Sequence, residues 1–122
     1  MYKAVLSVSA LLGCFGVVLG AFGAHYLKQK LSLESLAVFE TGVRYQMYHA
    51  FALFISAWAL GQFEQSFFGY SAYAFILGVL LFSGSLYLIS VYGLRGLGIV
   101  TPIGGLFLIV GWVFLLVGFL KS

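Results

Sequence analysis

The sequence is poor in charge. It has no aspartate, only three glutamates and six lysine or arginine residues, so charged residues make up 7% of the chain. Soluble globular domains carry about 25% charged residues, and so few charged side chains cannot cover the surface of a water-soluble fold of this size. Hydrophobic residues make up 63% of the chain instead. The composition therefore indicates an integral membrane protein, whose solvent is itself apolar.

The missing residue types also argue against several classes of function. Without aspartate many acid–base sites cannot be built, and the chain contains no G-x-S-x-G, H-E-x-x-H or P-loop motif. The scattered basic residues form no stripe for nucleic acid and fit lipid headgroups better. The single cysteine, Cys14, cannot form an intramolecular disulfide and is interpreted as a small buried packing residue. We expect no enzymatic activity, no catalytic residues, no metal or other cofactor, and no nucleic-acid partner.

Long runs without any charge dominate the sequence. They cover residues 4–27, 45–63, 65–94 and 96–120. Each reaches the roughly 20 residues with which a helix crosses a hydrocarbon core of about 30 Å, and none alternates in polarity as the strands of a β-barrel do. We predict an all-α integral membrane four-helix bundle, a single four-span domain over residues 1–122. The spans are expected at about 4–24, 45–62, 70–92 and 101–120.

Two helix starts can be predicted from capping residues. Ser32 is a suitable N-cap for a helix that begins at Leu33. Only Gly42 interrupts the residues that follow, so the second span is expected to continue a partly helical interfacial segment. Thr101 and Pro102 are predicted to be the N-cap and first residue of the last regular helix.

Small residues are predicted to mark the contacts between helices, because they let two backbones approach closely. A seven-residue repeat, as found in the fourth span, suits a left-handed crossing. In the third span, Ser83 and Ser85 lie near the middle of the membrane and can bond back to the preceding turn or across to a neighbouring helix. The expected packing residues are Gly13, Gly16, Gly20 and Ala24 in the first span and Gly104, Gly111 and Gly118 in the fourth.

Polar residues concentrate at the end of the first span and the start of the second. Glu40 precedes Arg44 by four residues, the favourable order for an ion pair along a helix. Because the first two spans are antiparallel neighbours, we expect His25 and His49 to lie at similar depth. Polar groups near hydrocarbon normally face protein or water and have partners. The cluster comprises His25, Glu40, Arg44, Tyr45, Gln46, Tyr48 and His49.

Three interpretations of this cluster are open. We favour the first, in which these side chains are structural anchors at the membrane interface. The protein is then a structural or regulatory component that is surrounded by membrane lipids and acts through helix–helix association, with itself or with another membrane protein. The second is a small transporter or channel subunit with a proton relay at His25, Glu40, Arg44 and His49. The third is a membrane-embedded haem or metal protein that uses the two imidazoles, although no ligand-spaced carboxylates or thiols accompany them.

The basic residues also predict an orientation. Both termini share one side of a four-span protein, and Lys3 and Lys121 lie there. The opposite side holds Lys28, Lys30, Arg44 and Arg95. The positive-inside rule places this second side in the cytoplasm and therefore both termini on the non-cytoplasmic side.

Motifs along nearly the whole chain resemble a known family. They read Gly-Ala-Phe-Gly-Ala-His at 20–25, Glu-Thr-Gly-x-x-Tyr-Gln-x-Tyr-His-Ala at 40–50, Phe-Ser-Gly-Ser-Leu-Tyr at 82–87, and Thr-Pro-Ile-Gly-Gly at 101–105 with Gly111-Trp112. The pattern is similar to the family catalogued as domain of unknown function 423, the YgdD/YwdK-like small inner-membrane proteins. The resemblance implies a four-span protein of the bacterial plasma (inner) membrane and no established activity.

Overall fold

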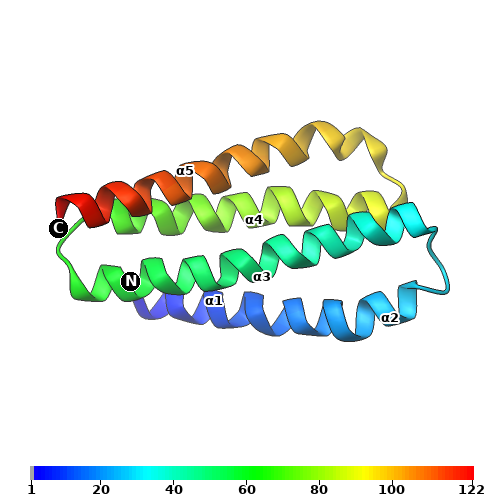
Figure 1. The fold of residues 1–122 in the computed structure, drawn as a ribbon, viewed down its shortest axis with the longest axis horizontal. Coiled ribbons are helices and arrows are strands. Elements are labelled where there is room, and N and C mark those ends of the chain that lie inside the picture. Colours follow the sequence, from blue (N-terminus) through cyan, green and yellow to red (C-terminus); the bar gives the residue numbers. More distant parts are fainter. Residues whose placement is uncertain (1) are drawn as a thin grey trace.

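The computed structural model describes residues 2–122 and contains four long helical segments that form a bundle (Figure 1). The predicted all-α four-helix bundle is confirmed, and Met1, which the predicted domain also includes, lies outside the described residues. The first segment consists of α1 (Tyr2–Val17), a π-helical stretch η1 (Val18–Gly23) and α2 (Ala24–Leu27). The others are α3 (Leu33–Gln62), α4 (Phe67–Tyr92), and a 3₁₀ segment η2 (Arg95–Ile99) that leads into α5 (Val100–Lys121).

The helices pack in the order in which they follow one another along the chain. α1 packs on α3, α3 on α4 and α4 on α5, whereas α1 and α5 share no extensive interface. Figure 1 shows α3 between α1 and α4, with both termini at the same end of the bundle. The side chains of Leu53, Phe68 and Phe75 are fully buried. The centre of the core therefore lies between α3 and α4.

Local interactions explain where α3 begins and α4 ends. The Ser32 hydroxyl accepts a hydrogen bond from the Ser35 backbone N–H at 3.1 Å, and α3 begins at Leu33, which confirms the predicted cap. α4 is followed by Gly93 at φ 70°, a left-handed conformation that costs glycine little. The Gly93 N–H donates to the Ile89 carbonyl at 3.0 Å and thereby satisfies one free group at the helix end.

The start of the last helix differs from the prediction. α5 begins at Val100, so the assignment of Thr101 as N-cap and Pro102 as first residue is wrong. The 3₁₀ segment before it leads directly into the helix, and the Thr101 hydroxyl is hydrogen-bonded to Ser85 of α4 instead. Pro102 still lies in the first turn, where a backbone N–H has no partner within the helix.

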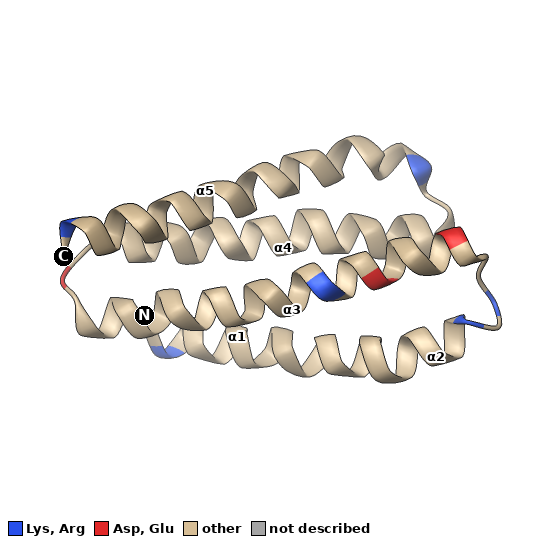
Figure 2. Cartoon of the chain, viewed as in Figure 1, with Lys and Arg blue, Asp and Glu red and all other residues tan. Residues whose placement is uncertain are grey.

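Three of the segments are long and apolar enough to cross a membrane: Tyr2–Leu27, Phe67–Tyr92 and Arg95–Lys121. α3 is longer, at 30 residues, but more polar. Figure 2 shows the charged residues mainly at the two ends of the bundle, whereas Glu40 and Arg44 lie within α3. α3 is therefore the helix on which polar chemistry has to be examined.

Candidate functional site

Gln46 connects three helices. Its side chain is only 4% exposed and lies on the inner face of α3. Its Nε2 donates to the Leu12 carbonyl of α1 at 2.8 Å, and its Oε1 accepts from the Tyr87 hydroxyl of α4 at 2.6 Å. Gln46 was among the predicted site residues, whereas Tyr87 was only part of a family motif. The amide therefore fixes α1 and α4 to α3 at one level of the bundle.

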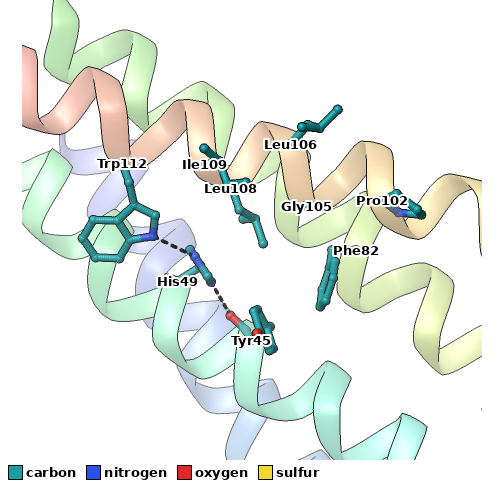
Figure 3. Close-up of a pocket in the computed structure, with 9 residues that line it drawn as sticks. All are labelled: Tyr45, His49, Phe82, Pro102, Gly105, Leu106, Leu108, Ile109 and Trp112. Carbon is teal, nitrogen blue, oxygen red and sulfur yellow. Dashed lines mark hydrogen bonds between the residues drawn. The ribbon is translucent and has the colours of Figure 1, made fainter.

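His49 connects α3 to α5 (Figure 3). Its Nδ1 lies 2.7 Å from the Tyr45 carbonyl oxygen, and its Nε2 lies 3.0 Å from Trp112 Nε1. An indole N–H can only donate, so Nε2 is the acceptor and Nδ1 carries the proton of a neutral imidazole. Both ring nitrogens therefore have partners, and no lone pair is free for a metal or a transferred proton.

Trp112 was not predicted as a site residue. Tryptophan in membrane proteins concentrates near the ends of spans, whereas Trp112 lies at the middle of α5. That unusual position is the signal that could have identified it as a hydrogen-bond partner.

The hydroxyls of the two serines predicted near mid-membrane form hydrogen bonds to two different neighbouring helices. The Ser83 hydroxyl donates to the Gly42 carbonyl of α3 at 2.7 Å. The Ser85 hydroxyl pairs with that of Thr101 in α5. Neither lines an open path, and both hold α4 to a neighbour.

A second pair of serines, absent from the predicted site, forms a hydrogen bond nearer the other end of the bundle. There the Ser71 hydroxyl of α4 donates to that of Ser56 in α3 at 2.8 Å, and both side chains are fully buried. Among the described residues, every buried side-chain nitrogen or oxygen has a hydrogen-bond partner. The interior polar groups are thus satisfied by the bundle itself.

The glycines predicted to pack in the first span do not all do so. Gly16 lies against the Met47 side chain, and a Cβ at Gly20 would lie 3.1 Å from the Val43 side chain. At Gly13, by contrast, a Cβ would meet no atom within 4 Å, so its predicted packing role is wrong. Gly13 lies in the same regular helix as Gly16 but about 60° around it, at the edge of the face that meets α3. Ala24 is partly buried, whereas Cys14 is exposed, so the interpretation of Cys14 as a buried packing residue is wrong.

The seven-residue glycine repeat of α5 lies against a matching repeat of phenylalanines in α4. All three glycines are buried. A Cβ at the first would overlap the α4 backbone, and at the other two it would come within 2.5 and 2.7 Å of a ring. The closest approach of α4 and α5 therefore depends on these positions. The facing pairs are Gly104 with Phe82, Gly111 with Phe75 and Gly118 with Phe68.

The two histidines do not lie at similar depth, so that prediction is wrong. Gly23 of the first segment faces Phe39, and His25, close by in α2, is exposed. His49 is buried and lies ten residues beyond Phe39 along α3, whereas His25 lies two residues beyond Gly23 in the opposite direction along the bundle. At 1.5 Å per residue, the two histidines are therefore separated by about 18 Å along the bundle. The prediction failed because the polar start of α3 is itself helical and shifts His49 toward the middle.

The predicted ion pair between Glu40 and Arg44 is absent. Within residues 2–122 no nitrogen of Arg44 lies within 4.0 Å of a Glu40 oxygen. Arg44 Nη2 instead donates to the Thr41 hydroxyl at 3.2 Å, which satisfies the guanidinium locally. Glu40, Arg44 and Tyr48 are all exposed on the outer side of α3. These residues therefore belong to a surface, whereas Gln46 and His49 belong to the interior.

A groove of about 440 Å³ opens between α3 and α5 beside His49 (Figure 3). Its polar side chains are Tyr45 and His49, and the His49 ring nitrogens are already engaged. The groove therefore suits apolar atoms better than an ion. It is lined by Tyr45, His49, Phe82, Pro102, Gly105, Leu106, Leu108, Ile109 and Trp112.

Comparisons with known proteins also indicate a membrane protein. The family described as "Protein of unknown function (DUF423)" matches residues 19–105. The membrane protein SH2409 of Staphylococcus haemolyticus is 40% identical over 98% of this chain and 97% of its own. YwdK of Bacillus subtilis is 38% identical over 98% of both chains, and the inner membrane protein YgdD of Escherichia coli is 37% identical over 96% of this chain and 89% of its own. No solved structure shows significant similarity. The chain therefore belongs to the DUF423 family of membrane proteins.

Proposed function

We propose that this protein is a structural or regulatory membrane component that acts through helix–helix association and is not an enzyme. The observation that supports the proposal is the use of the buried polar side chains. Gln46, His49 and Ser83 each hold α3 to a neighbouring helix. Groups engaged in this way are poorly suited to bind a substrate or to transfer a proton.

The proposal includes four membrane spans, at about 4–24, 45–62, 70–92 and 101–120. Three helices have the length and hydropathy to cross a bilayer. α3 is less apolar, but it packs along both α1 and α4 and so runs through the same layer. Its outer face in this region carries large apolar side chains such as Phe51, Ile55 and Trp58, which are compatible with lipid or with another helix.

The geometry gives less support to a transporter or channel subunit. His25 is separated from His49 along the bundle, Glu40 and Arg44 point outward, and His49 has partners on both nitrogens. These groups do not line one path. Flux measurements in proteoliposomes test the alternative: we expect wild type, His49→Ala and Glu40→Gln to match empty liposomes, and faster flux for wild type alone would favour a transporter.

The proposed orientation has both termini on the non-cytoplasmic side of a bacterial plasma (inner) membrane. It is supported by the larger number of basic residues at the opposite end of the bundle. A Cys14→Ala background with either Ser122→Cys or Gln29→Cys tests it with a membrane-impermeant maleimide. Ser122→Cys should react in intact spheroplasts and Gln29→Cys only after lysis, and the reverse pattern would contradict the orientation.

Association itself can be tested by crosslinking in native membranes, followed by measurement of the mass of the detergent-solubilised particle. We expect a particle larger than one chain, or a reproducibly crosslinked membrane protein. A strictly monomeric particle without any crosslinked neighbour would remove the proposal.

A further inference from the structure

The outer face of α3 carries a regular seam, which we call the α3 seam. Its residues follow one another at alternating spacings of three and four, the period with which one helix packs against another in a left-handed crossing. α1 and α4 lie on other faces of α3, where Met47 meets Gly16 and Gly42 meets Tyr87. The seam consists of Thr41, Arg44, Tyr48, Phe51, Ile55 and Trp58.

The large side chains of the α3 seam are exposed in the single chain. Phe51 is 67% exposed, Tyr48 54%, Trp58 48% and Ile55 39%. Aromatic side chains of this kind are enriched where proteins associate, because each supplies a large contact area with little loss of conformational freedom. The seam has the size and spacing of a helix-packing surface that the chain itself does not cover.

Arg44 lies deeper in the membrane than the level of the lipid headgroups. The hydrogen bond from Ser83 to Gly42 places this part of α3 beside residues just past the middle of α4. A hydrocarbon core of about 30 Å centred on α4 would leave the Arg44 backbone about 12 Å inside its edge, so in this placement the second span extends toward the start of α3, beyond the boundary at about residue 45 proposed above. The guanidinium reaches only about one turn toward the start of α3, where it donates to the Thr41 hydroxyl. A charged group at this depth is normally paired or faces water.

The complementary charge is present on the same face. Glu40 is exposed one turn away and is not paired with Arg44 of its own chain. In two parallel α3 helices related by a two-fold axis along the membrane normal, Glu40 of each copy can approach Arg44 of the other. An interface of this type is self-complementary, so both contacts form at once.

We propose that a second copy of this chain docks on the α3 seam, with Glu40 and Arg44 forming reciprocal ion pairs between the copies. The inference rests on the proposed function and names the partner for it. The charges then lie in the interface and away from the lipid chains, and the aromatic residues below them pack against each other.

The first test is crosslinking between copies in native membranes. In a Cys14→Ala background, Phe51→Cys places a thiol on the α3 seam. Val113→Cys is the matched control, because Val113 is 51% exposed on α5 and lies close to the level of Phe51, as the His49–Trp112 hydrogen bond shows. Copper phenanthroline should convert Phe51→Cys to a disulfide-linked dimer at least about tenfold more efficiently than Val113→Cys.

The second test exchanges the charges. Glu40→Arg alone or Arg44→Glu alone gives each copy two like charges, and we expect the crosslinked fraction at position 51 to fall about tenfold, as for loss of a close interfacial charge pair. When the two single variants are co-expressed with different tags, their seams are complementary again. Mixed dimers should then form at close to the wild-type level. Recovery in the mixture also shows that each variant is folded.

The outcomes separate this inference from the proposed function. Efficient crosslinking at Val113→Cys with none at Phe51→Cys would preserve association but overturn the α3 seam as its site. Single variants that crosslink as well as wild type, or a mixture without recovery, would overturn the ion pairs. A mixture without recovery is the result expected if Arg44 binds the phosphate of an anionic lipid. Absence of any dimer at either position, with a monomeric particle, would overturn both proposals.

Discussion

Two adjacent glycines of α5 allow the packing of the bundle to be tested with a single methyl group. A Cβ at Gly104 would overlap the backbone of Phe82 in α4, whereas a Cβ at Gly105 would lie 3.7 Å from the nearest atom of the Phe82 ring, an ordinary contact. Replacing glycine by alanine favours a helix by up to about 1 kcal/mol. Overpacking a close contact costs about 1–3 kcal/mol, and here the obstacle is backbone that cannot change rotamer.

We therefore expect Gly104→Ala to lower the free energy of unfolding by about 1–2 kcal/mol, and Gly105→Ala to leave it unchanged or raise it by up to about 1 kcal/mol. The measurement is reversible unfolding in mixed micelles with increasing dodecyl sulfate, followed by far-ultraviolet circular dichroism. The two variants share composition, helix and depth, so the comparison isolates the contact with α4. Equal midpoints, or a more stable Gly104→Ala, would refute the packing of α4 on α5.

Three further predictions concern the polar ties, whose individual worth in membranes averages about 0.6 kcal/mol and reaches about 1.7 kcal/mol. Gln46→Leu and Tyr87→Phe should each destabilise the protein, and their double variant should lose less than the sum in the same unfolding assay; additive losses would mean that the hydrogen bond is not formed. Trp112→Phe should lower stability by about 0.6–1.7 kcal/mol and shift the Nε2 resonance of His49 in ¹⁵N spectra, and an unchanged resonance would argue against the tie to α5. Ser83→Ala should cost about 0.6 kcal/mol and Ser83→Thr less, whereas a neutral Ser83→Ala would show that the bond to α3 is dispensable.

The fold could be predicted because its determinants are local in sequence. Charge-free runs fix the approximate helices, Ser32 marks the start of α3, and the glycine spacing of α5 matches the phenylalanine spacing of α4. Each of these signals depends on one segment and on general properties of helices in an apolar solvent. The π-helical stretch in the first segment has no comparable signal and was missed.

The candidate site was harder to predict, because it depends on how helices are rotated about their axes. Spacing puts Glu40 and Arg44 on a different face of the helix from His49 but does not say which face points inward. In the structure Gln46 and His49 point inward, and Glu40 and Arg44 point outward. The partners Tyr87 and Trp112 are distant in sequence and could be found only from tertiary contacts. Spacing alone also favoured an ion pair that the neighbouring Thr41 hydroxyl replaces.

The polarity of α3 follows from its position between the other helices. In lipid, apolar contact with another helix offers little advantage over contact with acyl chains, so hydrogen bonds and close packing determine which face points inward. Gln46 and His49 serve this purpose toward the other three helices. Substituting them should therefore weaken the single chain itself. Glu40 and Arg44 have no such role within one chain, so their substitution should leave unfolding in detergent nearly unchanged and alter only the contacts between chains in the membrane.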